Sequence, residues 1–195
     1  MSDTIIRSYN RHDRKKVLKI YNEGLKPLLD NSIRFSLNSI VYSFLLNSNS
    51  TLVAQVSDEV VGFVDLRNMT WPFCVETYLH LEWLIEGSPG DWKDFKGLDS
   101  NSNIFFDAQY AMNISVSEEH RRKGIANSMM DELLIKARRY ETTNQIVPIY
   151  THCWNGNNQA SLKLVKKLGF NELGTLPGYY PDGQSATIVR FGEHL

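Results

Sequence analysis

The sequence is poor in cysteine, in net charge and in long apolar runs, and each shortage excludes a class of protein. Its two cysteines, Cys74 and Cys153, lack the spacing of a metal site or redox motif, which favours two buried free thiols over a disulfide. A net charge of −1 provides no overall attraction for nucleic acid or an anionic membrane. No apolar run approaches the ~20 residues of a membrane span, and the polar start at 1–4 does not resemble a signal peptide. We therefore expect a cytoplasmic protein with no nucleic-acid partner and no membrane partner.

What the sequence does contain is the composition of an ordinary globular protein. Of its 195 residues 42% are hydrophobic and 22% charged, which suits one domain with a full core, and we predict a single domain over 1–195. The alternation of strand and helix patterns predicts an α/β (α+β) fold in which helices flank a mixed central β-sheet. The predicted strands are 4–9, 52–56, 60–66, 105–116, 146–154, 170–175 and 186–191, and the predicted helices are 13–24, 27–45, 125–140 and 158–168.

One stretch, from Ile114 to Ala126, carries the clearest chemical signal. A predicted strand ends at Val116, a turn with acidic and then basic residues follows, and a helix with apolar residues at i, i+4 and i+8 spacing begins. The first N–H groups of a helix have no internal acceptor, and the helix dipole adds positive charge there. The small residues Gly124 and Ala126 would let phosphate oxygens approach the backbone. The basic side chains that add positive potential are Arg121, Arg122 and Lys123.

Two motifs then identify a family resemblance. The spacing Arg-x-x-Gly-x-Ala at 121–126 resembles the acyl-CoA pyrophosphate loop of the GNAT superfamily of N-acetyltransferases. Further along, Asn158-x-x-Ser161 followed by a Leu-Gly-Phe motif at 168–170 resembles the signature of that family on its last helix and the following strand. The loop motif is common by itself, but the two motifs in this order are specific. The resemblance is sharp over 105–191 and holds in outline over 4–67.

The resemblance implies acetyl-CoA as the acyl-donor substrate and no metal. In the GNAT fold, strands four and five of the sheet splay apart, and the pantetheine arm of the donor lies between them, bonded to strand backbone. The implied cofactor-binding residues are Ile114 and Val116 on strand four, the turn residues Arg121, Arg122, Lys123, Gly124, Ile125 and Ala126 for the pyrophosphate, and Asn158 for the pantetheine.

The catalytic groups depart from the family pattern. Many relatives protonate the leaving thiolate with a Tyr four residues before the Gly of Leu-Gly-Phe, but that position is Val165 here. Ser161 is the alternative donor, on the inward face of its helix, unless it only bonds back to a helix carbonyl. The strand-four Glu that often serves as base is missing near 110–112. Asp107 and His152 are the candidates instead, although a histidine among apolar strand residues is also typical of a core.

An insert at 68–103, between strands three and four, has no counterpart in the minimal fold. It contains six aromatic residues, and this density argues against disorder. Two interpretations stay open. The insert either adds a packing layer to the domain or forms a wall of the acceptor pocket.

The sequence therefore predicts direct transfer of an acetyl group from acetyl-CoA to a primary amine. The first choice of partner is a small-molecule amine or amino-acid-like acceptor, because neither the pI of about 6.5 nor any acidic run suggests a dedicated protein partner. The alternatives are a protein N-terminal acetyltransferase and a non-catalytic acyl-CoA-binding module. A nucleotide-binding protein is disfavoured, since the loop lacks the Lys-Ser/Thr of such sites. Either a monomer or a homodimer is compatible with the sequence.

Overall fold

The computed structural model of the chain describes residues 3–25, 46, 49–69, 108–138, 148–154, 159–177 and 184–192. The chain divides into two compact units. Unit 1 comprises Met1–Leu66 and Ala111–Arg139, and unit 2 comprises Arg67–Tyr110 and Tyr140–Leu195. Among the described residues, no helix is both long enough and apolar enough to span a membrane.

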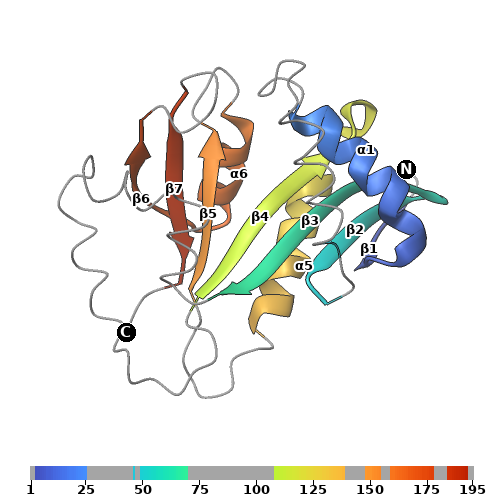
Figure 1. The fold of residues 1–195 in the computed structure, drawn as a ribbon, viewed down its shortest axis with the longest axis horizontal. Coiled ribbons are helices and arrows are strands. Elements are labelled where there is room, and N and C mark those ends of the chain that lie inside the picture. The colour runs from blue at the N-terminus through green and yellow to red at the C-terminus, as the bar shows by residue number, and fades with distance from the viewer. Residues whose placement is uncertain are drawn as a thin grey trace. The chain divides into compact units, whose positions relative to one another are not determined.

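The described strands form a seven-stranded sheet with the order β1-β2-β3-β4-β5-β7-β6 (Figure 1). The pairs with a defined register are antiparallel except β4 with β5, which run parallel. The strands are β1 (Thr4–Ser8), β2 (Thr51–Val56), β3 (Glu59–Met69), β4 (Ala108–Val116), β5 (Ile149–Trp154), β6 (Asn171–Leu176) and β7 (Ala186–Phe191). The helices are α1 (Arg14–Leu25), α5 (Ile125–Arg138) and α6 (Ala160–Lys167), with 3-10 turns η1 (Arg11–Asp13) and η3 (Glu118–His120).

In unit 1, two helices cover opposite faces of the β2–β3 hairpin. On one face, Phe63 packs in a buried cluster with α1, together with Val53 of the neighbouring strand. The preceding residue, Gly62, points to the other face, where an added Cβ would lie 3.0 Å from the Met129 side chain of α5. The same Cβ would lie 3.0 Å from the Ser115 carbonyl oxygen, a backbone atom of β4, so glycine gives the neighbouring backbone room at this point.

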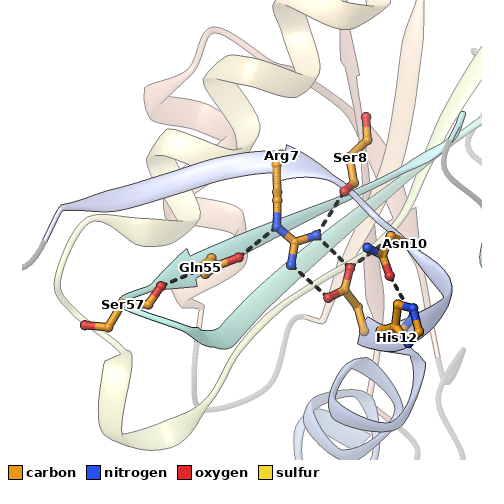
Figure 2. Close-up of polar contacts among 7 residues, drawn as sticks. Arg7, Ser8, Asn10, His12, Gln55 and Ser57 are labelled. Carbon is orange, nitrogen blue, oxygen red and sulfur yellow. Dashed lines mark hydrogen bonds and ion pairs between the residues drawn. The ribbon is translucent and has the colours of Figure 1, made fainter.

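An ion pair between Arg7 and Asp13 holds the corner between β1 and α1, and Figure 2 shows Arg7 among its hydrogen-bond partners. Two guanidinium nitrogens of Arg7 donate to the Asp13 carboxylate at 2.7 and 2.8 Å, and its Nε donates to Gln55 Oε1 at 2.8 Å. The Asn10 amide also donates to Asp13, at 2.8 Å. Burial alone would raise the pKa of Asp13, but the hydrogen bonds from Arg7 and Asn10 outweigh it and lower that pKa. This corner is a closed polar network that links β1, β2 and η1.

In unit 2, the glycine and the phenylalanine of the Leu-Gly-Phe motif form the C-terminal cap of α6. Gly169 is left-handed, with φ of 89°, and its N–H donates to the Lys166 carbonyl at 3.1 Å. The Phe170 N–H donates to the Val165 carbonyl at 3.1 Å, which completes a Schellman cap. Phe170 is then buried against Phe191 of β7, with ring centroids 5.3 Å apart. The motif therefore ends the helix and directs the chain into β6.

The predicted α/β fold with a mixed sheet is confirmed. The register between β4 and β5 comprises Gln109 with Ile149 and Tyr110 with Tyr150, and the splay of these strands stays a prediction, as does the single domain. The predicted helix 27–45, the part of the insert from 70 to 103 and the closing turn 178–183 lie outside the described residues.

Candidate active site

The turn after β4, in unit 1, has the backbone geometry of an anion-binding loop. Arg122 and Gly124 both adopt the left-handed conformation, with φ of 61° and 83°. α5 begins at Ile125, and the Ser128 N–H makes a helical bond to the Gly124 carbonyl at 3.1 Å. The amides that precede Ser128 in this first turn have no acceptor within the helix. A Cβ on Gly124 would meet no atom within 4 Å, so the space beside this residue is open to a ligand.

The same turn is basic and firmly attached to the end of β4. Arg121 Nε donates to the Val116 carbonyl at 3.0 Å, and the Ser117 N–H donates to the Val61 carbonyl of β3 at 2.8 Å. The ring of His120 shares a hydrogen bond with Ser117 Oγ at 3.1 Å. Cations beside an open helix N-terminus suit a phosphate group. The exposed basic residues of the turn are Arg121, Arg122 and Lys123.

The strand residues expected to bind pantetheine lie directly before this turn. Ile114 is half-buried and Val116 is buried. The Val116 carbonyl accepts the bond from Arg121 Nε. Between these residues, Ser115 points to the face of α1, where its Oγ would overlap a Cβ added to Gly24. The last turn of α1 therefore packs directly on the segment of β4 that is expected to hold the acyl donor.

In unit 2, His152 of β5 pairs with a residue that the sequence did not single out. Nδ1 of His152 shares a hydrogen bond with the hydroxyl of Tyr110 on β4, and the two rings stack with centroids 5.9 Å apart. His152 keeps some accessible surface, but enough protein surrounds its ring that burial lowers its pKa to about 4. The imidazole is therefore neutral at physiological pH.

Ser161 lies on the other face of β5 from this pair. Its side chain shares a hydrogen bond with Cys153, the strand residue after His152, and adjacent strand residues point to opposite faces. Cys153 is a buried free cysteine, as predicted, and burial raises its pKa to about 12, so the group stays a thiol. Val165, one helical turn after Ser161, is also buried.

The structure thus groups the predicted residues in two sets. The residues expected to bind the pyrophosphate lie in one turn of unit 1. In unit 2, His152 and Ser161 lie on opposite faces of β5. Asp107 and Asn158 lie outside the described residues. The sequence does not mark Tyr110 as functional, because the resemblance leads to the expectation of a carboxylate at this point of the strand. An aromatic hydroxyl one strand away from a candidate histidine is the signal that was available.

The known proteins that are similar to this chain include two curated relatives and a solved structure. It is 30% identical to an N-alpha-acetyltransferase of Saccharolobus solfataricus over 80 residues, which are 41% of this chain and 46% of the relative. It is 27% identical to an N-alpha-acetyltransferase of Sulfurisphaera tokodaii over 137 residues, 70% of this chain and 65% of the relative. The chain therefore spans about half to two thirds of the length of these relatives. The solved structure of yncA from Salmonella typhimurium with its cofactor acetyl-CoA has a TM-score of 0.64 at 18% identity, and covers 100% of this chain and 97% of that one.

The basic left-handed turn that opens α5 and the Schellman-capped Leu-Gly-Phe motif of α6 both lie in the part of the sequence that a known family describes. That family is the acetyltransferase (GNAT) family, which matches residues 17–170. The chain belongs to the acetyltransferase (GNAT) family.

Proposed function

We propose that this protein transfers the acetyl group of acetyl-CoA to the α-amino group of a polypeptide N-terminus. The observation that carries the donor half of the proposal is the turn after β4. There the left-handed Gly124 leaves open space beside the first amides of α5, and three basic side chains are exposed around it. Acetyl-CoA supplies the thioester, and its pyrophosphate would bind this turn. A structural neighbour solved with acetyl-CoA supports the assignment.

The acceptor reaches the enzyme as an ammonium ion, so a group must take its proton before the nitrogen can attack the thioester carbon. The Tyr110–His152 pair suits this role. The tyrosine hydroxyl can accept the ammonium proton while its own proton passes to His152 Nδ1. Because the pKa of His152 is about 4, the imidazole holds a proton only weakly and would release it to solvent. The pair therefore works as a relay.

When the nitrogen–carbon bond forms and the carbon–sulfur bond breaks, the leaving thiolate needs a proton. Ser161 is the candidate donor. Burial raises the pKa of Cys153, so the neighbour of Ser161 is a neutral thiol, and no charged acceptor beside the serine competes for its hydroxyl proton. This arrangement would assign the base to one face of β5 and the acid to the other.

The name N-alpha-acetyltransferase, carried by both curated relatives, supports a polypeptide N-terminus as acceptor over a small amine. The near-neutral charge of the chain, which suggested a small amine, does not oppose it. An extended N-terminus can be bound by backbone hydrogen bonds and apolar pockets, without a charged docking surface.

Turnover with matched peptides tests the proposal. Purified protein is incubated with acetyl-CoA and tetrapeptides that have a free α-amine, and CoA release and peptide mass are followed. The control peptides have a blocked α-amine and a free lysine. We expect acetylation of the free α-amine alone. Turnover restricted to small amines such as free amino acids or polyamines would refute the acceptor class. Acetyl-CoA binding without CoA release from any amine would indicate a non-catalytic module.

A further inference from the structure

Three adjacent strands of unit 2 place an arginine in line with the Tyr110–His152 pair. Tyr110 of β4 is in register with Tyr150 of β5, and Tyr150 is in register with Arg190 of β7. Residues in register on neighbouring strands point to the same face. His152 is two residues from Tyr150 on β5, so its side chain also lies on this face, as its bond to Tyr110 requires.

Arg190 differs from the other members of this row because no described residue is a partner for its side chain. In the part of the chain that the structure describes, its buried Nε has no hydrogen-bond acceptor and no carboxylate pairs with it. On the β5 side of Arg190 the neighbours on the same face are aromatic or apolar, since Tyr110, Tyr150 and Ile188 are each at most 1% exposed. On the β6 side its register partner is the exposed Asn171. A buried Nε donor without an acceptor is costly. A ligand anion would remove that cost.

The spacing matches a small bifunctional acceptor. Neighbouring strands lie about 4.8 Å apart and residues along a strand about 3.3 Å apart, so the Cα atoms of His152 and Arg190 are separated by about 8 Å. Long side chains on one face can reach toward each other across such a separation, so a small acceptor could place a carboxylate at the guanidinium and an amine at the Tyr110–His152 pair. A guanidinium binds carboxylate through two parallel hydrogen bonds, which fixes orientation as well as position.

We propose that Arg190 is an acceptor-binding residue that selects acceptors with a carboxylate close to the reacting amine. The inference rests on the proposed acetyl transfer and on the assignment of the Tyr110–His152 pair to the amine side. The carboxylate has two possible sources: the side chain of an acidic first residue in a polypeptide, or the α-carboxylate of a free amino acid.

Equilibrium binding in the presence of CoA tests the proposal without needing turnover. Dissociation constants are measured by titration calorimetry for two matched pairs, an amidated tetrapeptide beginning with glutamate against one beginning with glutamine, and alanine against alaninamide. We expect the acid member of one pair to bind the wild type more tightly by roughly 10–100-fold, the range of a charge-assisted hydrogen bond. Arg190→Gln should abolish that preference. Lys163→Gln, an exposed change of the same charge on α6, should keep it.

The outcomes separate this inference from the proposed function. A preference in the peptide pair that Arg190→Gln abolishes supports both. A preference confined to alanine over alaninamide, and lost in Arg190→Gln, supports the arginine site and overturns the N-terminal acceptor. No acid preference in the wild type, or one that survives Arg190→Gln, overturns the arginine site. If Arg190→Gln does not fold, Arg190→Lys replaces it, because loss of the two-pronged geometry should still weaken the preference.

Discussion

Arg7 in unit 1 and Arg190 in unit 2 are both half-buried arginines on strands, but they differ in the number of hydrogen bonds that their side chains make within the described residues. Arg7 donates to Asp13 twice and to Gln55 once, at 2.7 to 2.8 Å (Figure 2). Arg190 has a buried Nε with no acceptor in the described residues. The hydrogen bonds of Arg7 join β1 to η1 and β2. The Nε donor of Arg190 makes no hydrogen bond within the described residues.

Other polar groups of the molecule also differ in whether they are bonded within a structural network or lie at the candidate site. Asp13 is satisfied by Arg7 and by the Asn10 amide, so its corner has a structural role. The first amides of α5 have no acceptor within the helix, and the space beside Gly124 is open. The Tyr110–His152 pair is a hydrogen-bonded pair in which the imidazole is neutral. Changing a group that is bonded within a structural network, such as Asp13, should lower stability. Changing a group of the candidate site should instead lower ligand affinity or the rate of transfer.

The largest effect is expected at the turn that opens α5. Ala126→Glu places a carboxylate beside the expected pyrophosphate, and like charges about 4 Å apart repel by ~4 kcal/mol near a protein surface. Acetyl-CoA affinity, measured by titration calorimetry, should fall by at least roughly 100-fold, while the melting temperature stays near that of the wild type. Ile135→Glu, which adds the same charge at an exposed position of α5, should leave affinity unchanged. Unaltered binding by a folded Ala126→Glu protein would refute the pyrophosphate assignment.

The next effect concerns the proton relay. Tyr110→Phe keeps the buried ring but removes the hydroxyl bonded to His152, so kcat should fall by ~10²–10⁴ with little change in acetyl-CoA affinity. Steady-state kinetics with the best acceptor gives both values. Tyr150→Phe, on the same face but outside the pair, is the matched control. A near-normal kcat for Tyr110→Phe would assign proton removal to another group.

A smaller effect distinguishes the two arginines directly. Arg7→Met leaves Asp13 in the buried corner without its cation, and the free energy of unfolding should fall by roughly 2–3 kcal/mol, the size of hydrogen bonds to a charged group. Arg190→Met removes no bond within the described fold, so stability should be unchanged or raised. Urea denaturation of the two variants measures both values. An equal loss of stability in both would mean that Arg190 is structural.

The smallest effect is a difference in pH dependence. Burial lowers the pKa of His152 to about 4, so between that value and the ordinary 6.5 the unfolded chain binds more protons than the native protein. Stability should therefore fall as the pH drops from 6.5 to 4. The lowered pKa of Asp13 stabilises the fold above the ordinary 3.8, and this contribution is lost only as the pH falls below that value.

Denaturation at a series of pH values separates these two groups. His152→Gln should flatten the profile between pH 6.5 and 4, and Asp13→Asn should flatten it only below 3.8. If His152→Gln retains the wild-type slope in its window, the histidine is not held neutral by burial.

Much of the local structure could be predicted from the sequence because it depends on short-range geometry. The Leu-Gly-Phe motif predicted a helix end, and the Schellman cap at Gly169 explains it. The basic turn at 121–126 predicted a strand followed directly by a helix, as β4 and α5 are. These predictions depend on a glycine that can adopt positive φ and on the spacing of apolar residues. Each of these features can be recognised in a few consecutive residues.

The sequence by itself therefore determined the family, the mixed sheet and the turn that is expected to bind the donor. Only the tertiary structure decided which side chains meet across strands. Tyr110 and His152 are far apart in the chain, and their contact depends on the parallel register of β4 and β5. The row that ends in Arg190 depends in addition on the antiparallel register of β5 and β7. Register is set by the packing of whole strands against their neighbours, so no short motif encodes it.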